Sequence, residues 1–162
     1  MKYFGLELHK EVVGGASAVH PEDRHVDARV VAPKAIFDVD ADIFAPCAMG
    51  DVLNAEVCRR LQARIVVGAA NDQLAEPACA EQLHARGIVY VPDYVANAGG
   101  VIEAAWQRRA DYDRRRVMAH IAGIERTLET ILERAGREGL PPVAIADRLA
   151  EERFVKRRIQ AT

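Results

Sequence analysis

Polar side chains follow three short apolar runs in this sequence, and their types suit the binding of a small polar molecule. Cys47 follows the first run, and Asn71-Asp72-Gln73 follows the second. Asp93 and Asn97 follow the third. Amide and carboxylate groups that converge from neighbouring loops bind a carboxamide, a ribose or a carboxylate with strong directionality. Any one of these residues could equally well be a turn former as a ligand-binding residue. Three sets at successive strand ends, however, favour a ligand-binding site at that edge of the sheet.

The elements that must position these residues alternate between strands and helices. The predicted strands are Ile43–Ala45, Arg64–Ala70 and Ile88–Val91. Two helices are predicted between these strands. The first is capped by Asp51 and has Leu53, Val57 and Leu61 on its apolar face. The second runs from Pro77 to Arg86 and ends before Gly87. This alternation predicts β-α-β units and a parallel sheet. The strands are apolar throughout, which indicates that both faces of the sheet are covered.

The second half of the chain is predicted to be helical. An irregular loop carries Asp93 and Asn97, and Gly99-Gly100 opens a helix. A long helix follows from about Tyr112 to Gly136, and after Gly139 and Pro141-Pro142 a last helix covers about Val143 to Arg158. The apolar stripe of the long helix is Val117, Ile121, Ile124, Leu128, Ile131 and Leu132.

The first 35 residues carry weaker patterns. Phe4, Leu6, Leu8 and Val12 suit a short helix that ends at Gly14-Gly15, and Ala16–Val19 suits a short strand. No G-x-G-x-x-G turn follows a strand, and Gly14-Gly15 precedes the predicted strand, so it cannot form a phosphate cradle.

Composition excludes several function classes. The 162 residues are 50% hydrophobic and 28% charged, and the net charge of −2 favours neither nucleic acid nor a membrane surface as partner. Three cysteines without C-x-x-C spacing favour a reducing compartment, which we expect to be the cytoplasm. His20-Pro21-Glu22 with Pro46-Cys47 partly matches a zinc deaminase signature, but Gly50 stands where its second cysteine belongs. We therefore expect no metal site.

Three further features have simpler structural readings. Cys47 has no base near it in the sequence and is interpreted as a small packing residue. The arginines at 108–109 and 114–116 are interleaved with Asp111 and Asp113, which indicates a solvated, self-paired helix face. Trp106, with Val101 and Ile102, is interpreted as helix core.

Several motifs in order resemble the leucine/phenylalanine/valine dehydrogenases, and the resemblance runs from about Val30 to Arg158. The motifs are Asp42-Ile-Phe-Ala-Pro-Cys-Ala-Met-Gly50, Val67-Gly-Ala-Ala-Asn71, Leu83-His-Ala-Arg-Gly-Ile-Val-Tyr-Val-Pro-Asp-Tyr-Val-Ala-Asn-Ala-Gly-Gly100 and Ala146-Asp-Arg-Leu-Ala-Glu-Glu-Arg153. Members of that family use NAD to oxidatively deaminate an L-amino acid or to reductively aminate a 2-oxo acid. The resemblance implies a partial Rossmann-like parallel sheet that lacks its first strand and glycine-rich turn, followed by long C-terminal helices.

The resemblance also assigns site residues. It implies that Ala45, Pro46 and Cys47 lie beside the nicotinamide ribose, and that Asn71 and Asn97 lie near the nicotinamide and the substrate carboxylate. Asp72 departs from the family pattern, in which many members carry a second asparagine. The family's catalytic lysines and aspartate belong to an N-terminal domain and match no position here, so no residue is assigned a catalytic role.

We expect one domain over 1–162, with a divergent segment at 1–35, half of a dinucleotide-binding fold at 36–106 and C-terminal helices at 107–162. The first functional hypothesis is a truncated or split NAD-dependent L-amino-acid dehydrogenase that needs a homo-oligomer or a partner chain for activity. The alternative is a repurposed non-redox protein that binds a small molecule or a partner at the same edge. A third hypothesis is an enzyme of different chemistry that uses Asp72, Asp93 or Cys47.

Overall fold

The computed structural model describes residues 2–3, 6–7, 12–14 and 29–160 of the chain. Strand β1 (Lys2–Tyr3) pairs antiparallel with β2 (Leu6–Glu7), and β3 (Val12–Gly14) pairs parallel with β4 (Arg29–Val31). A third sheet holds β5 (Ile43–Phe44), β6 (Ile65–Val66) and β7 (Val89–Tyr90), parallel and in that order. The predicted class, a partial Rossmann-like parallel α/β fold with long C-terminal helices, is confirmed, although each strand is shorter than its apolar run.

The N-terminal prediction is wrong where the structure describes it. Leu6 lies in β2 and Val12 in β3, so these residues do not share a short helix. Gly14 is the last residue of β3, whereas the sequence pattern placed it at the end of a short helix. The predicted strand Ala16–Val19 lies outside the described residues.

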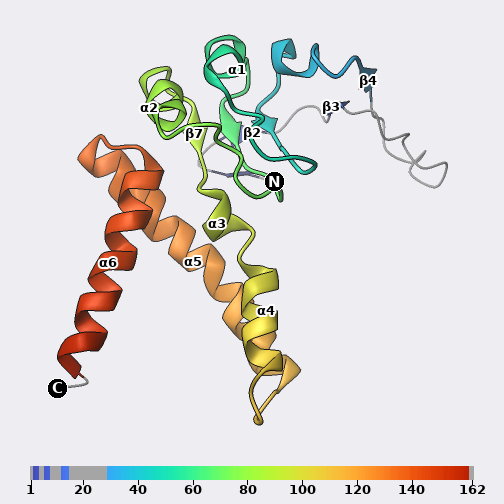
Figure 1. Cartoon of the computed structure of the whole chain (residues 1–162). Helices are drawn as coiled ribbons and strands as arrows, with labels where there is room; N and C mark the ends of the chain where they lie inside the picture. Colours follow the sequence, from blue (N-terminus) through green and yellow to red (C-terminus); the bar gives the residue numbers. More distant parts are fainter. Residues whose placement is uncertain (1, 4–5, 8–11, 15–28, 161–162) are drawn as a thin grey trace.

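Two helices connect the strands of the third sheet and pack side by side (Figure 1). Helix α1 (Ala55–Arg60) follows β5, and α2 (Ala78–Ala85) follows β6. The cap of α1 is Asn54, whose Oδ1 accepts hydrogen bonds from the backbone N–H groups of Glu56 at 3.0 Å and Val57 at 3.1 Å. Asp51, the predicted cap, instead has a left-handed backbone with φ of 56°.

A first apolar core lies between these helices and the sheet. Its buried members are Leu53, Val57, Cys58, Leu61, Ala63, Val66, Cys79, Leu83, Ile88 and Tyr90. The expectation that the strands are covered on both faces is only partly met, because Val89 on β7 is 38% exposed.

Four helices follow the sheet. The segment predicted as an irregular loop contains the short helix α3 (Asp93–Ala96), which corrects that prediction. Helix α4 (Gly99–Gln107) then leads away from the sheet, and α5 (Arg114–Glu138) runs back beside it (Figure 1). A turn through Gly139, with φ of 66°, leads to α6 (Pro142–Gln160).

A second apolar cluster joins α5 to α6. Its buried members are Ile131, Ala135, Ile145 and Ala146, and Val95 of α3 packs against it. The predicted stripe of α5 is buried at Val117 and Ile131 and half-buried at its other positions. Helix α3 therefore packs against the second cluster, although it directly follows strand β7 of the sheet.

Ion pairs and cation–π contacts stabilise the turn between α4 and α5. The Arg109 side chain lies 2.8 Å from the Asp111 carboxylate and that of Arg116 lies 3.0 Å from it, which confirms pairing within the arginine-rich segment. Both guanidinium groups also lie over the Trp106 ring, 4.6 and 4.8 Å from its centroid. Trp106 is half-buried and Val101 is 74% exposed, so the interpretation of these residues as helix core is wrong.

Among the described residues, no helix is both long and apolar enough to cross a membrane.

Candidate functional site

Three loops leave the third sheet at one edge. The strand register pairs Phe44 with Val66 and Val66 with Tyr90, so the residues that follow these three positions emerge side by side. This edge is formed by the carboxyl ends of parallel strands, where open α/β sheets bind ligands. We call it the strand-end edge.

The two asparagines that sequence analysis selected meet at this edge. The Asn97 Nδ2 donates a hydrogen bond to the Asn71 Oδ1 at 2.7 Å, and it also lies 3.3 Å from the Ala70 carbonyl oxygen and 3.4 Å from that of Ala69. Asn71 is exposed and Asn97 is half-buried. Within the described part of the chain, the Asn97 Oδ1 and the Asn71 Nδ2 make no hydrogen bond, so the pair leaves one acceptor and one donor unused.

The loop after β5 is packed tightly against the loop after β6. The Ala70 N–H donates to the Pro46 carbonyl oxygen at 3.0 Å, and the Ala69 N–H donates to the Cys47 Sγ at 3.5 Å. A Cβ on Gly68 would lie 2.1 Å from the Pro46 carbonyl oxygen, so only glycine fits there. Pro46 is buried between its exposed neighbours Ala45 and Cys47. Sequence analysis did not assign a role to Gly68, although Gly68 lies in the predicted strand Arg64–Ala70 and in the motif Val67-Gly-Ala-Ala-Asn71.

The interpretation of Cys47 as a packing residue is wrong, because its side chain is exposed. Cys58 and Cys79 are fully buried in the first core, and burial raises the pKa of the Cys58 thiol to about 12. Only a thiolate reacts with iodoacetamide, so the native chain is expected to label at Cys47 at least about 100-fold faster than at the other two.

Peptide mass spectrometry after a short exposure at pH 8 measures this difference, and a Cys47→Ser variant should lose the fast label. Equal labelling of all three cysteines would contradict the burial of Cys58 and Cys79.

Two polar side chains lie buried beneath the strand-end edge. Gln73 is fully buried, and its Nε2 donates to the carbonyl oxygens of Gly68 at 2.9 Å and Ala70 at 2.8 Å. Asp93 is 7% exposed, and its carboxylate accepts hydrogen bonds from the backbone of the β6 loop and of α3. The sequence placed both residues at strand ends, but it gave no sign that they are buried.

The neighbouring Asp72, unlike Gln73 and Asp93, is not buried. Its side chain is exposed and its backbone is left-handed, with φ of 51°. Its carbonyl oxygen accepts a hydrogen bond from the Asp51 N–H at 2.7 Å, which joins the β6 loop to the chain segment before α1.

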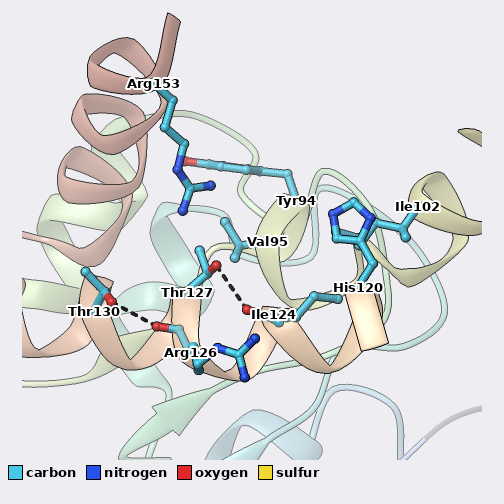
Figure 2. Close-up of a pocket in the computed structure, with 11 residues that line it drawn as sticks. Tyr94, Val95, Ile102, His120, Ile124, Arg126, Thr127, Thr130 and Arg153 are labelled. Carbon is cyan, nitrogen blue, oxygen red and sulfur yellow. Dashed lines mark hydrogen bonds between the residues drawn. The ribbon is translucent and has the colours of Figure 1, made fainter. Parts of the chain in front are cut away.

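A cleft of about 580 Å³ opens beside α3, on helices α4, α5 and α6 (Figure 2). Its lining residues are Tyr94, Val95, Ala98, Ile102, His120, Gly123, Ile124, Arg126, Thr127, Thr130 and Arg153. Asn71 and Asn97 do not line it. The Tyr94 hydroxyl donates to the Asp147 carboxylate at 2.6 Å and so connects α3 to α6. Burial and this carboxylate raise the pKa of Tyr94 above its usual range.

In the described part of the chain, no group of three or more His, Cys, Asp or Glu side chains is placed to hold a metal ion.

Comparisons with known proteins agree on one family. The family model for glutamate/leucine/phenylalanine/valine dehydrogenase matches residues 6–157. A leucine dehydrogenase from Bacillus subtilis is 45% identical over 131 residues, which are 81% of this chain and 36% of that protein. A valine dehydrogenase from Streptomyces albus is 43% identical over 160 residues, 94% of this chain and 41% of that protein.

A solved structure gives the same result. The crystal structure of L-tryptophan dehydrogenase from Nostoc punctiforme superposes with a TM-score of 0.82 at 39% identity, covering 90% of this chain and 44% of that one. The chain thus spans less than half the length of the relatives it matches.

Proposed function

Because this chain belongs to the glutamate/leucine/phenylalanine/valine dehydrogenase family, we propose that it provides the nicotinamide-binding part of an NAD-dependent L-amino-acid dehydrogenase. The proposed reaction is the oxidative deamination of an L-amino acid and, in reverse, the reductive amination of a 2-oxo acid. The observation that carries the proposal is the meeting of Asn71 and Asn97 at the carboxyl ends of three parallel strands.

The donor and acceptor left over by this pair fit a nicotinamide carboxamide. A carboxamide both donates and accepts, which matches the Asn97 Oδ1 and the Asn71 Nδ2. A substrate carboxylate would use the Asn71 donor alone. We propose that Ala45, Pro46 and Cys47 line the ribose side, because their loop is fastened to the β6 loop through Pro46 and Cys47. When bound, NAD supplies the hydride acceptor for the amino acid.

The residues of this chain bind and orient in this proposal, and the proton transfers need groups from elsewhere. Deamination requires a general acid and base near the substrate nitrogen. The lysines of the chain are Lys2, Lys10, Lys34 and Lys156, and none lies in the three strand-end loops. We therefore propose that a partner chain or a second subunit completes the active site, and we place the protein in the cytoplasm, where its three free thiols are stable.

Replacing Asn97 with Ala is expected to weaken NADH binding by roughly tenfold, because one ligand hydrogen bond and the anchor of Asn71 are lost together. The midpoint of thermal unfolding should change little, since Asn97 is only half-buried. Titration of NADH by fluorescence measures the dissociation constant, and calorimetry measures the midpoint.

The matched control is Gln107→Ala, which removes an exposed amide that, among the described residues, donates only to Glu103 at 3.2 Å. If the two variants bind NADH equally, the asparagine pair is not part of the cofactor site. If wild-type protein fails to bind NADH with or without a partner, the cofactor proposal itself fails.

A second candidate function is ligand binding without redox chemistry. The absence of lysine from the three strand-end loops favours it. Assays of 2-oxo acids with ammonia and NADH, on protein that binds NADH, separate the two candidates, because only the dehydrogenase consumes NADH.

A further inference from the structure

Asp93 is the acidic side chain that the described part of the chain buries most deeply. It is 7% exposed and makes no ion pair there, so its charge has no cationic partner. A buried carboxylate is costly unless hydrogen bonds satisfy it. Two backbone N–H groups donate to the Asp93 carboxylate, and the Tyr90 side chain also interacts with it. The Gln73 N–H donates to Oδ2 at 3.0 Å, and the Tyr94 N–H donates to Oδ1 at 2.7 Å.

These two bonds join the two loops that carry the asparagine pair. Gln73 lies two residues after Asn71, and Asp93 lies four residues before Asn97. One carboxylate therefore holds the β6 loop with one oxygen and the start of α3 with the other. Burial and the neighbouring Asp93 carboxylate raise the pKa of Tyr90 above its usual range, so Tyr90 of β7 also lies next to this carboxylate.

Hydrogen bonds hold both ends of the stretch from Ala70 to Gln73. The Gln73 side chain holds the Ala70 carbonyl oxygen at 2.8 Å, and the Asn97 amide lies 3.3 Å from the same oxygen. The Gln73 backbone is fixed by Asp93. The position of Asn71 relative to Asn97 therefore depends on where the Asp93 carboxylate holds Gln73.

We propose that Asp93 is a positioning residue, whose carboxylate sets the register between the β6 loop and α3 so that Asn71 and Asn97 present their free amide groups to the ligand. This inference rests on the proposed function for the identity of the ligand, but the arrangement of the two amides is a property of the free protein. Removal of the carboxylate should therefore alter the asparagine pair even in the absence of NADH.

The test is Asp93→Asn, which keeps the size of the side chain but replaces one acceptor with a donor that faces a backbone N–H. The control is Asp72→Asn in the β6 loop, next to Gln73, where the carboxylate is exposed. In the free protein, the side-chain amide signals of Asn71 and Asn97 in nitrogen-15 NMR spectra should move in the Asp93 variant only. NADH binding, measured well below the unfolding midpoint of either variant, should weaken roughly tenfold in that variant only.

The NMR and binding results together decide whether Asp93 positions the asparagine pair. Unmoved amide signals, or moved signals with NADH affinity within twofold of wild type, would overturn the positioning role. If the wild-type protein does not bind NADH either alone or with a partner, the proposed function fails, and the amide signals of the free protein decide whether Asp93 positions the asparagine pair.

If the Asp93 variant does not fold, hydrogen exchange of the wild-type protein decides instead. The Gln73 amide should exchange about 100-fold slower than the exposed amide of Asp72. Equal exchange of the two amides would show that the carboxylate does not hold the β6 loop.

Discussion

Replacing Gly68 with Ala is expected to lower the free energy of unfolding by about 3 kcal/mol, a large effect for the addition of one methyl group. The new Cβ would lie 2.1 Å from the Pro46 carbonyl oxygen and 2.6 Å from the Pro46 nitrogen. Both atoms belong to backbone, so no side chain can move aside. The β5 loop would have to separate from the β6 loop, which breaks the bond from the Ala70 N–H to Pro46.

Thermal unfolding measures this change, and a domain of this size should lose roughly 6–12 °C in its midpoint. The matched control is Gly136→Ala on α5, where a Cβ meets nothing within 4 Å. That substitution should stabilise the chain by about 0.5–1 kcal/mol, because Ala favours the helix over Gly. A Gly68 variant as stable as wild type would mean that the two loops are not in contact.

Replacing Ile145 with Ala is expected to destabilise the chain by about 2–5 kcal/mol, because Ile145 is fully buried in the second apolar cluster. The cavity would lie between α5 and α6, close to Ile131 and Ala135. Chemical denaturation followed by circular dichroism measures the free energy of unfolding.

Val155→Ala on the same helix serves as the control, because Val155 is 57% exposed and should change stability by less than about 0.5 kcal/mol. If the two variants lost equal stability, α6 would not be packed on α5 through Ile145.

The strands and helices of the sheet region were predictable because local patterns determine them. Short apolar runs marked β5, β6 and β7, and Gly87, with φ of 73°, marked the end of α2. The start of α1 was not predictable in the same way. Asp51 and Asn54 are both good capping residues, and the choice depends on a distant contact. The carbonyl oxygen of Asp72 holds the Asp51 N–H, so Asp51 adopts a left-handed backbone outside the helix.

The N-terminal strands were missed for a similar reason. Leu6 and Val12 belong to an apolar pattern that predicted a short helix, but their backbones pair with Tyr3 and Arg29. Such pairing is set by residues elsewhere in the chain, and no periodicity within the segment reports it.

The candidate site was predictable in part. Asn71 and Asn97 were selected because they follow neighbouring parallel strands, and the structure brings them within hydrogen-bond distance. The residues that hold them were not predictable. Whether an Asp or Gln at a strand end is buried depends on which loop covers it, and the contact of Gly68 with Pro46 depends on the spacing of two loops.

Helix α3 makes the arrangement of the distant helices matter for the asparagine pair. It is four residues long and has contacts on two sides. Asp93 accepts a hydrogen bond from the Gln73 N–H of the β6 loop, and Val95 packs against the second cluster. The Tyr94 hydroxyl adds a hydrogen bond to Asp147 of α6. Because these contacts tie α3 to both parts, a displacement of α5 and α6 relative to the sheet would be expected to change the position of Asn97 relative to Asn71.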